Sequence, residues 1–213
     1  MYNLLLMKIF VMFFLCCSAE KVEKTEQIQD LNNLKNDNAK QKTYNIDLEN
    51  SFVKWTGKKI TKSHSGSIDI NSGTILMQGK KVISAEIKMD MNSIQNTSIK
   101  NQNSRDNLTS HLKNEDFFNV DSFPISIIKI NNSTELDDST YIFKSDLTIK
   151  GITNPVEFTG NIFFLDGKYL ANIDLTFDRT LWNIRYGSGK FFDNLGDRII
   201  LDEIYISASL LTN

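Results

Sequence analysis

The chain has few of the residues that build disulfide frameworks, thiolate metal sites or nucleic-acid-binding surfaces. Its only two cysteines, Cys16 and Cys17, are adjacent, and neighbouring cysteines do not easily bridge each other. The rest of the chain therefore has no disulfide and no cysteine metal ligand. The 24 Lys and Arg residues nearly balance the 26 Asp and Glu residues, so no net field attracts nucleic acid.

Proline and glycine are also scarce, with two and ten residues among 213, which excludes a fibrous or disordered chain. Hydrophobic residues make up 40% of the sequence and include fourteen Phe, as in a globular domain. Without the amino-terminal segment, the chain has room for one domain of roughly 170 residues with a sizeable core.

Residues 1–17 have the pattern of an export signal. Lys8 precedes a short apolar run, residues 9–15, which cannot span a bilayer and is followed by small residues. Cys17 at the end of this run resembles the lipid-modified cysteine of bacterial lipoproteins, which implies lipid attachment at Cys17 and a membrane anchor. Ordinary cleavage after Ala19 is the alternative. Both interpretations predict export to the cell envelope, into the periplasm.

Residues 18–43 are rich in Glu, Lys, Gln, Asn and Asp, which favours a solvated tether between anchor and domain. Ile28, Leu31 and Leu34 share a helical spacing, so a short partner helix is the alternative. We therefore place the folded domain at residues 44–213.

The domain is dominated by apolar and polar residues that alternate with a period of two, the mark of half-buried strands. Residues 141–150 and 156–164 form two such runs and predict an antiparallel hairpin, with the turn between Gly151 and Pro155. Residues 83–92 and 169–178 show the same alternation, as does the stretch that ends the chain. Residues 107–119 lack it and predict a short helix.

These patterns predict an all-β fold of about eight strands, either a single antiparallel barrel or a two-sheet sandwich. A barrel of eight strands is either filled by side chains or wide enough for one slender ligand, and periodicity alone favours the filled core. Inward-facing residues are then candidates for contact with a ligand in the lumen. They are Trp55, Ala85, Ile87, Met89, Met91, Phe143, Leu147, Phe158, Phe164, Ala171, Ile173, Leu175 and Phe177.

Four segments share a recognisable set of motifs, namely WTGKK with His64 and Gly66 at residues 55–66, SHLKNEDFFNVD with Phe-Pro at 110–124, DLTIKGITNPV at 146–156 and DRTLWNIRYGS at 178–188. Together they resemble the YceI-like family of exported bacterial proteins. The resemblance covers residues 44–211, with departures at Ser145 and Asn183, where the family has Gly. It implies a lipocalin-like barrel whose lumen holds a polyisoprenoid chain such as that of a quinone.

Residues for catalysis are sparse. His64 and His111 are the only histidines, and neither has neighbours at metal-ligand spacing, so no metal site is predicted. We assign no catalytic residue, and no cofactor beyond a bound isoprenoid lipid or quinone. The predicted function is non-enzymatic binding or carrying of a long apolar lipid. One alternative is an enzyme with a rim site built from His64, His111 and Asp178 or Asp116, and another is a structural barrel with a filled core. The oligomeric state stays open.

Overall fold

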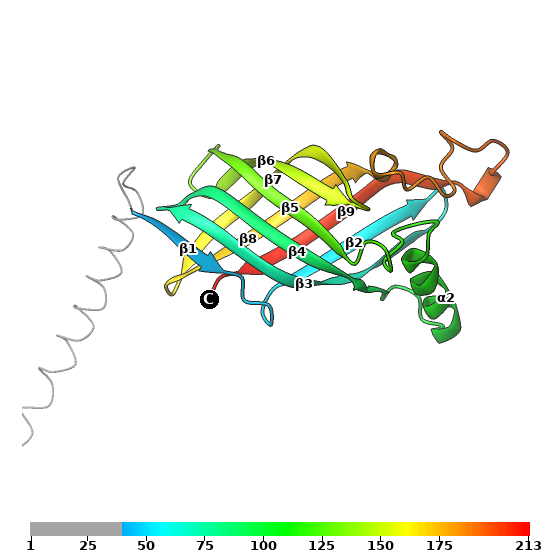
Figure 1. The fold of residues 1–213 in the computed structure, drawn as a ribbon, viewed down its shortest axis with the longest axis horizontal. Coiled ribbons are helices and arrows are strands. Elements are labelled where there is room, and N and C mark those ends of the chain that lie inside the picture. Colours follow the sequence, from blue (N-terminus) through cyan, green and yellow to red (C-terminus); the bar gives the residue numbers. More distant parts are fainter. Residues whose placement is uncertain (1–39) are drawn as a thin grey trace, which may run out of the picture. The chain divides into compact units, whose positions relative to one another are not determined.

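The computed structural model describes residues 40–213, which contain nine strands and one α-helix, α2 (Gln102–Lys113). Figure 1 shows them with two 3-10 turns, η1 (Arg179–Trp182) and η2 (Gly196–Arg198). The strands are β1 (Gln41–Asn45), β2 (Phe52–Lys59), β3 (Ser63–Gln78), β4 (Lys81–Asn96), β5 (Ile125–Glu135), β6 (Thr140–Ile149), β7 (Ile152–Leu165), β8 (Lys168–Asp178) and β9 (Ile200–Leu211). Lys42–Met77 and Lys81–Asn213 form one compact unit, the barrel unit.

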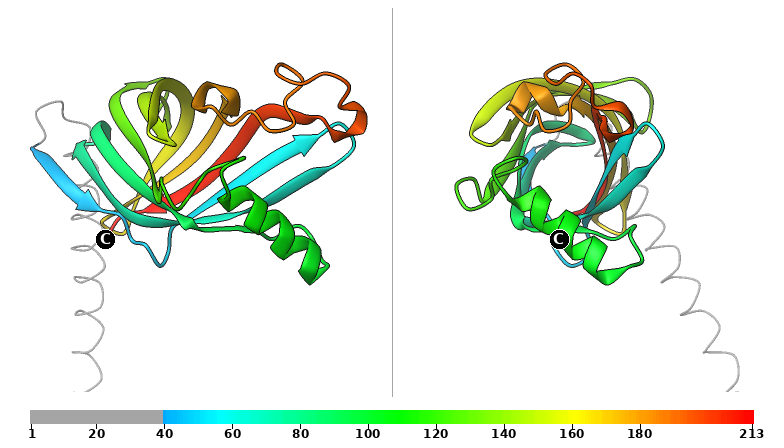
Figure 2. Two further views of the ribbon diagram at one scale, coloured as in Figure 1. Left: turned by 45° about the vertical axis from the view of Figure 1, so that its right-hand side comes forward. Right: turned by 90° about the vertical axis from the view of Figure 1, so that its right-hand side faces the viewer.

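Eight of the strands close into a ring. β2 pairs with β3 on one side and β9 on the other, each strand from β3 to β9 pairs with the next, and β1 adds to β3 outside the ring. The right-hand view of Figure 2 looks into this ring from the end that carries α2. The predicted single antiparallel barrel of about eight strands with a short helix is therefore confirmed, and the sandwich is excluded.

Side-chain alternation determines the inner face of the barrel. In β6, five alternate residues from Tyr141 to Ile149 are buried, as predicted. β4 differs at its start, because Val82 is buried and Ile83 only half-buried before Ala85 resumes the inward series. The inward series of β4 thus shifts by one residue, so Ile83, the first residue of the alternation expected over residues 83–92, does not belong to the inner face.

The hairpin of β6 and β7 turns earlier than predicted. Lys150 and Gly151 both have positive φ, of 51° and 71°, and Ile149 pairs with Ile152 directly across the turn. Two residues of positive φ match the right-handed twist of the flanking strands. Pro155 lies inside β7, where the strand has no β8 partner, since that pairing begins at Thr159. The missing N–H of Pro155 therefore costs no ladder hydrogen bond.

The helix α2 begins five residues earlier than predicted and ends at Lys113. The Asn101 side chain accepts a hydrogen bond from the Ser104 backbone N–H at 3.0 Å and so caps the first turn. Because the helix is mostly polar, packing rather than its own propensity holds it against the barrel, through the buried Leu112 of the helix and the buried Phe117 that follows it.

The chain itself covers one end of the barrel. After β1, the Ile46 N–H donates to the Gly73 carbonyl at 2.9 Å, and the Ile46 side chain is buried. A Cβ at residue 73 would lie 2.7 Å from the Ile46 side chain, so the glycine leaves the space that Ile46 needs to pack against β3. The Tyr44 and Tyr169 rings meet edge to face at 5.1 Å. We call this the closed end; its β-strand starts at Gln41, three residues before the predicted domain boundary.

Candidate functional site

A cavity of about 190 Å³ occupies the barrel lumen and is lined almost wholly by apolar side chains. Ile200 and Leu210, near the two ends of β9, both line it, so it runs along most of that strand. Its polar lining residues are Lys58, Lys59, His64, Ser126 and Arg179, four of which lie at or near the end opposite Ile46. We call that end, formed by the β2–β3 turn, residues 179–199 and α2, the mouth. The filled core that periodicity alone favours is not observed.

Most of the predicted lumen candidates line this cavity. Those that do are Trp55, Ile87, Met89, Met91, Leu147, Phe158, Ile173, Leu175 and Phe177. Ala85, Phe143 and Ala171 instead line a second cavity of about 20 Å³, together with Ile46. Phe164 lines neither cavity, and its ring packs on Tyr169 with 5.0 Å between the ring centres.

The second cavity lies toward the closed end and has room for little more than one water molecule. Four residues line both cavities and therefore form the partition between them. They are Ile87, Ile130, Ile173 and Leu210. A slender ligand that enters at the mouth reaches this partition before it reaches Ala85 or Ala171.

The sequence-based list missed several contributors to the lining, including β3 through Ile68 and β5 through Ile128 and Ile130. Leu108 and Leu112 of α2, with Phe117 and Phe118 after it, line the cavity at the mouth. Leu108 and Leu112 are spaced i, i+4 in an otherwise polar helix, and this spacing was the sign in the sequence that one helix face is buried. The last strand also lines the cavity, through Ile204, Ile206, Ala208 and Leu210, although its alternation was as clear as that of β8.

Residue Arg179 holds the base of the long mouth segment. Its buried guanidinium donates to the carbonyl oxygens of Ile184 at 2.8 Å, Ile200 at 3.0 Å and Leu201 at 3.2 Å. Burial lowers the pKa of Arg179, and the nearby carboxylate of Asp202 opposes that shift. Arg179 therefore ties together the two ends of residues 184–200.

Its neighbour Asp178 caps the η1 turn rather than facing a reactive group. The Asp178 carboxylate accepts from the Thr180 N–H at 2.9 Å and from Lys190 Nζ at 2.5 Å. Burial raises the pKa of Asp178, but these hydrogen bonds outweigh it and leave the pKa below its ordinary value. Trp182 follows, fully buried, with Nε1 donating to the Leu147 carbonyl at 3.0 Å.

The histidines occupy separate settings. His111 Nε2 lies 3.2 Å from Asp116 Oδ2, and its ring meets Phe117 and Tyr186 edge to face at 4.9 and 4.6 Å. His111 thus joins α2 to the long mouth segment and does not line the cavity. His64 lines it, and burial, followed by the charges of Lys59 and Lys62, lowers the His64 pKa.

Neither histidine belongs to a metal centre in the part of the chain that the structure describes, where no group of three His, Cys, Asp or Glu residues could hold an ion. Three buried polar atoms lack a hydrogen-bond partner among the described residues: Trp55 Nε1, Tyr141 Oη and Ser145 Oγ. Tyr141 is neutral, because burial raises its pKa to about 12. No helix within residues 40–213 is long and apolar enough to cross a bilayer.

A closed antiparallel barrel with an apolar lumen and one open end defines a lipocalin-like class of protein. The YceI-like domain model matches residues 44–210, and the chain belongs to that family. The curated proteins include no significant match.

Solved structures share the fold. BcnA of Burkholderia cenocepacia is 19% identical, with a TM-score of 0.66 over 79% of this chain and 99% of that one. A polyisoprenoid-binding domain from Saccharophagus degradans, implicated in plant cell wall breakdown, is 15% identical, with a TM-score of 0.61 over 80% and 97%. The YceI protein of Campylobacter jejuni is 15% identical, with a TM-score of 0.50 over 74% and 84%.

Proposed function

We propose that the protein binds a long apolar lipid of the polyisoprenoid type in its lumen and carries it without chemical change. The observation that supports this most strongly is the apolar cavity, which runs from the mouth to the partition formed with Ile173 and Leu210. The polyisoprenoid-binding domain from Saccharophagus degradans, which shares the fold, supports the same class of ligand.

The energetics suit a chain without directional contacts. Each Å² of apolar ligand surface removed from water contributes roughly 25 cal/mol, against the cost of freezing the chain's rotations. Many wall residues share that burial, so no single contact dominates. The lining near the partition is apolar and the cationic lining residues lie at the mouth, so the tail points toward the closed end and the polar headgroup stays near Lys58 and Lys59.

An enzymatic role has less support. Of the groups proposed for a rim site, His111 and Asp116 bond to each other, and Asp178 caps η1 and binds Lys190. Only His64 lines the cavity. A nucleophile with its base would have to converge on one point, and these side chains are committed to separate structural contacts.

The proposed setting is the bacterial cell envelope, with the domain exported and held at a membrane through lipid on Cys17. Cys17, the signal segment and residues 18–39 of the tether lie outside the described residues. Replacing Cys17 with Ser should release the protein into the soluble envelope fraction. Unchanged membrane association after replacement of both Cys16 and Cys17 would contradict the anchor.

The test of lumen binding is organic extraction of the purified protein followed by mass spectrometry. We expect a stoichiometric isoprenoid in the wild type. Introducing Asp at Met89, Leu147 or Ile173, which line the cavity, should empty the barrel, since an unpaired charge there is costly. The matched controls place Asp at the outward neighbours Lys88, Thr148 and Asn172 and should retain ligand. Circular dichroism must first show that each variant folds; a native wild type with an empty extract would contradict the proposal.

A further inference from the structure

Large apolar side chains project from the mouth into solvent. In residues 179–199, Leu181 of η1 is 58% exposed, and Phe191 and Phe192 of the segment that Arg179 holds at its base are 44% and 50% exposed. Ile60, at the tip of the β2–β3 turn, is exposed to the same degree as Leu181. Exposed groups of this size that surround one opening mark an interaction surface rather than scattered surface residues.

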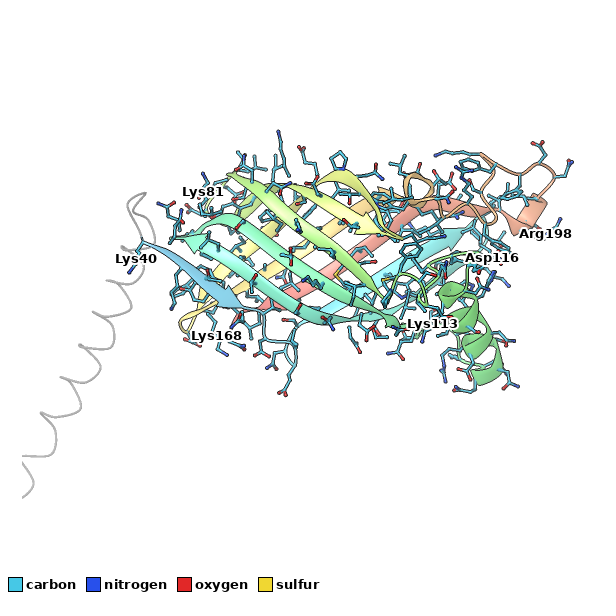
Figure 3. The ribbon with its side chains drawn as sticks, in the orientation of Figure 1. Lys40, Lys81, Lys113, Asp116, Lys168 and Arg198 are labelled. Atoms are coloured by element: carbon cyan, nitrogen blue, oxygen red, sulfur yellow. The ribbon has the colours of Figure 1, made fainter. Side chains whose placement is uncertain are left out.

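These apolar tips are flanked by cations. The β2–β3 turn, residues 57–64, carries Lys58, Lys59 and Lys62 and no acidic residue. Residues 183–199 carry Arg185, Lys190 and Arg198 against Asp193 and Asp197. Figure 3 places Arg198 at the tip of this segment, and the Arg185 guanidinium lies 4.6 Å from the centre of the Phe191 ring.

Acidic residues lie on both sides of the mouth: Asp193 and Asp197 belong to residues 183–199, whereas Glu115 and Asp116 follow α2. Asp116 bonds to His111, and Lys150 faces both Asp116 and Glu115, donating to the Glu115 carbonyl at 3.3 Å. Residues 183–199 thus carry three cations against two anions, and the neighbouring β2–β3 turn adds three Lys residues with no acidic residue. Burial first, and then the charges of Lys59 and Lys62, lower the pKa of His64 at this end.

The closed end also exposes large apolar side chains, including Leu48, Leu136 and Leu165, among charges of both signs. Its turns carry Asp47, Glu49, Asp137, Asp138 and Asp166, and Lys81 and Lys168 lie at the same end (Figure 3). Exposed apolar side chains thus occur at both ends of the barrel, but only those at the mouth lie beside the entrance to the lumen.

The segment that carries the apolar tips has a fixed base. Arg179 bonds to the backbone at both of its ends, and Tyr186 packs on His111 and Phe117 from the α2 side. Ile184 and Ile200, at the two ends, line the cavity. The apolar tips and the entrance to the lumen therefore belong to one surface.

We propose that the mouth docks on the surface of an anionic lipid bilayer, with Phe191 and Phe192 entering the interface and the surrounding Lys and Arg residues facing the headgroups. Aromatic and aliphatic side chains flanked by cations favour this zone, and binding strengthens with anionic lipid. Docking in this orientation opens the lumen toward the membrane. The proposal does not require that the lumen hold an isoprenoid.

Hydrogen exchange of the full chain, followed by mass spectrometry, tests the contact even if the amino-terminal segment also binds lipid. The probes are vesicles of phosphatidylcholine alone and of phosphatidylcholine with phosphatidylglycerol. We expect anionic vesicles to slow exchange in residues 60–62 and 183–199 but not in the closed-end turns 136–139 and 166–167, and the effect to fade as salt rises.

Two pairs of variants identify the groups responsible. Phe191→Ser with Phe192→Ser should abolish the protection, whereas Leu136→Ser with Leu165→Ser, matched in exposure at the closed end, should not. Lys62→Glu with Arg185→Glu should weaken binding by about twentyfold or more, because each basic residue near the surface strengthens it about fivefold. Lys168→Glu is the matched control.

Protection confined to the amino-terminal segment, equal protection at both ends, or protection that follows protein concentration without vesicles would each overturn the proposal. The last of these would indicate contact between copies of the chain. Isoprenoid extracted from the same preparations is measured separately. If the protein retains isoprenoid but vesicles do not slow its exchange, only the docking proposal is contradicted. If vesicles slow exchange but the lumen is empty, only the lumen-binding proposal is contradicted.

Discussion

At the closed end, Ile46 and Tyr169 help to line the remaining space of about 20 Å³, which accepts little more than a water molecule, and Tyr44 packs on Tyr169. At the mouth, α2 and residues 179–199 lie beside the opening and leave the apolar cavity accessible. Both ends belong to the same eight strands and the same inward alternation. The difference shows that the strands determine the width of the lumen, and the segments outside them determine where it opens.

Arg179→Ala should cause the largest loss of stability at the mouth relative to the closed end, because three backbone carbonyl groups at the mouth lose their hydrogen-bond donor. Each buried acceptor left without a partner costs about 1–3 kcal/mol, so we expect a loss of about 3 kcal/mol or more in the free energy of unfolding. Hydrogen exchange should accelerate first in residues 184–200, while the Ile46 backbone N–H at the closed end stays protected. Arg185→Ala, which removes an exposed cation of the same segment, is the control. Equal acceleration at both ends would show that Arg179 does not act locally.

Filling the lumen at two depths tests the partition. Ala208 lines only the large cavity, so Ala208→Leu should lower the amount of extracted lipid and leave the fold intact. Ala171 lines only the small one, so Ala171→Leu overfills it and should lower the free energy of unfolding by about 1–3 kcal/mol with lipid content unchanged. The outward Asn172→Leu is the control for both. If Ala171→Leu expels the lipid, the ligand extends past Ile173 and the partition opens.

The strands and their inner faces were predictable because a period of two depends only on which residues are buried on one side of a sheet. The sequence pattern placed the turn too late in the chain, because it treated Pro155 as the end of the turn. Proline interrupts a strand only where its missing N–H would have bonded to a neighbouring strand. The open lumen was not predictable, since Met89, Ile173 and Ile206 would have the same alternation in a filled barrel. Leu108 and Phe117 were missed as lining residues because α2 reaches the cavity only through tertiary contact.

The titration of His64 offers a smaller test, confined to the mouth. Its pKa is lower in the folded chain than in the unfolded one, so between these two values the unfolded chain binds more protons. Stability should therefore fall as the pH drops through about 6.5, the ordinary value for His, toward the lowered value. His64→Gln should remove this small part of the pH dependence, as measured by denaturant unfolding between neutral and mildly acidic pH. An identical pH dependence in both proteins would show that His64 titrates normally.

The smallest expected effect lies midway between the two ends, at Ser145. It faces inward on β6 between Phe143, which lines the small cavity, and Leu147, which lines the large one, and its buried hydroxyl has no hydrogen-bond partner in the described part of the chain. Removing an unpaired buried hydroxyl costs nothing, so Ser145→Ala should leave the free energy of unfolding unchanged or raise it by up to about 1 kcal/mol. Ser126→Ala is the matched control, because the Ser126 hydroxyl contacts Met91 Sδ at 2.9 Å and its loss should be slightly destabilising. A clear loss of stability or of bound lipid in Ser145→Ala would mean that the hydroxyl has a partner inside the lumen, and the polar group of the ligand would then lie near the partition rather than at the mouth.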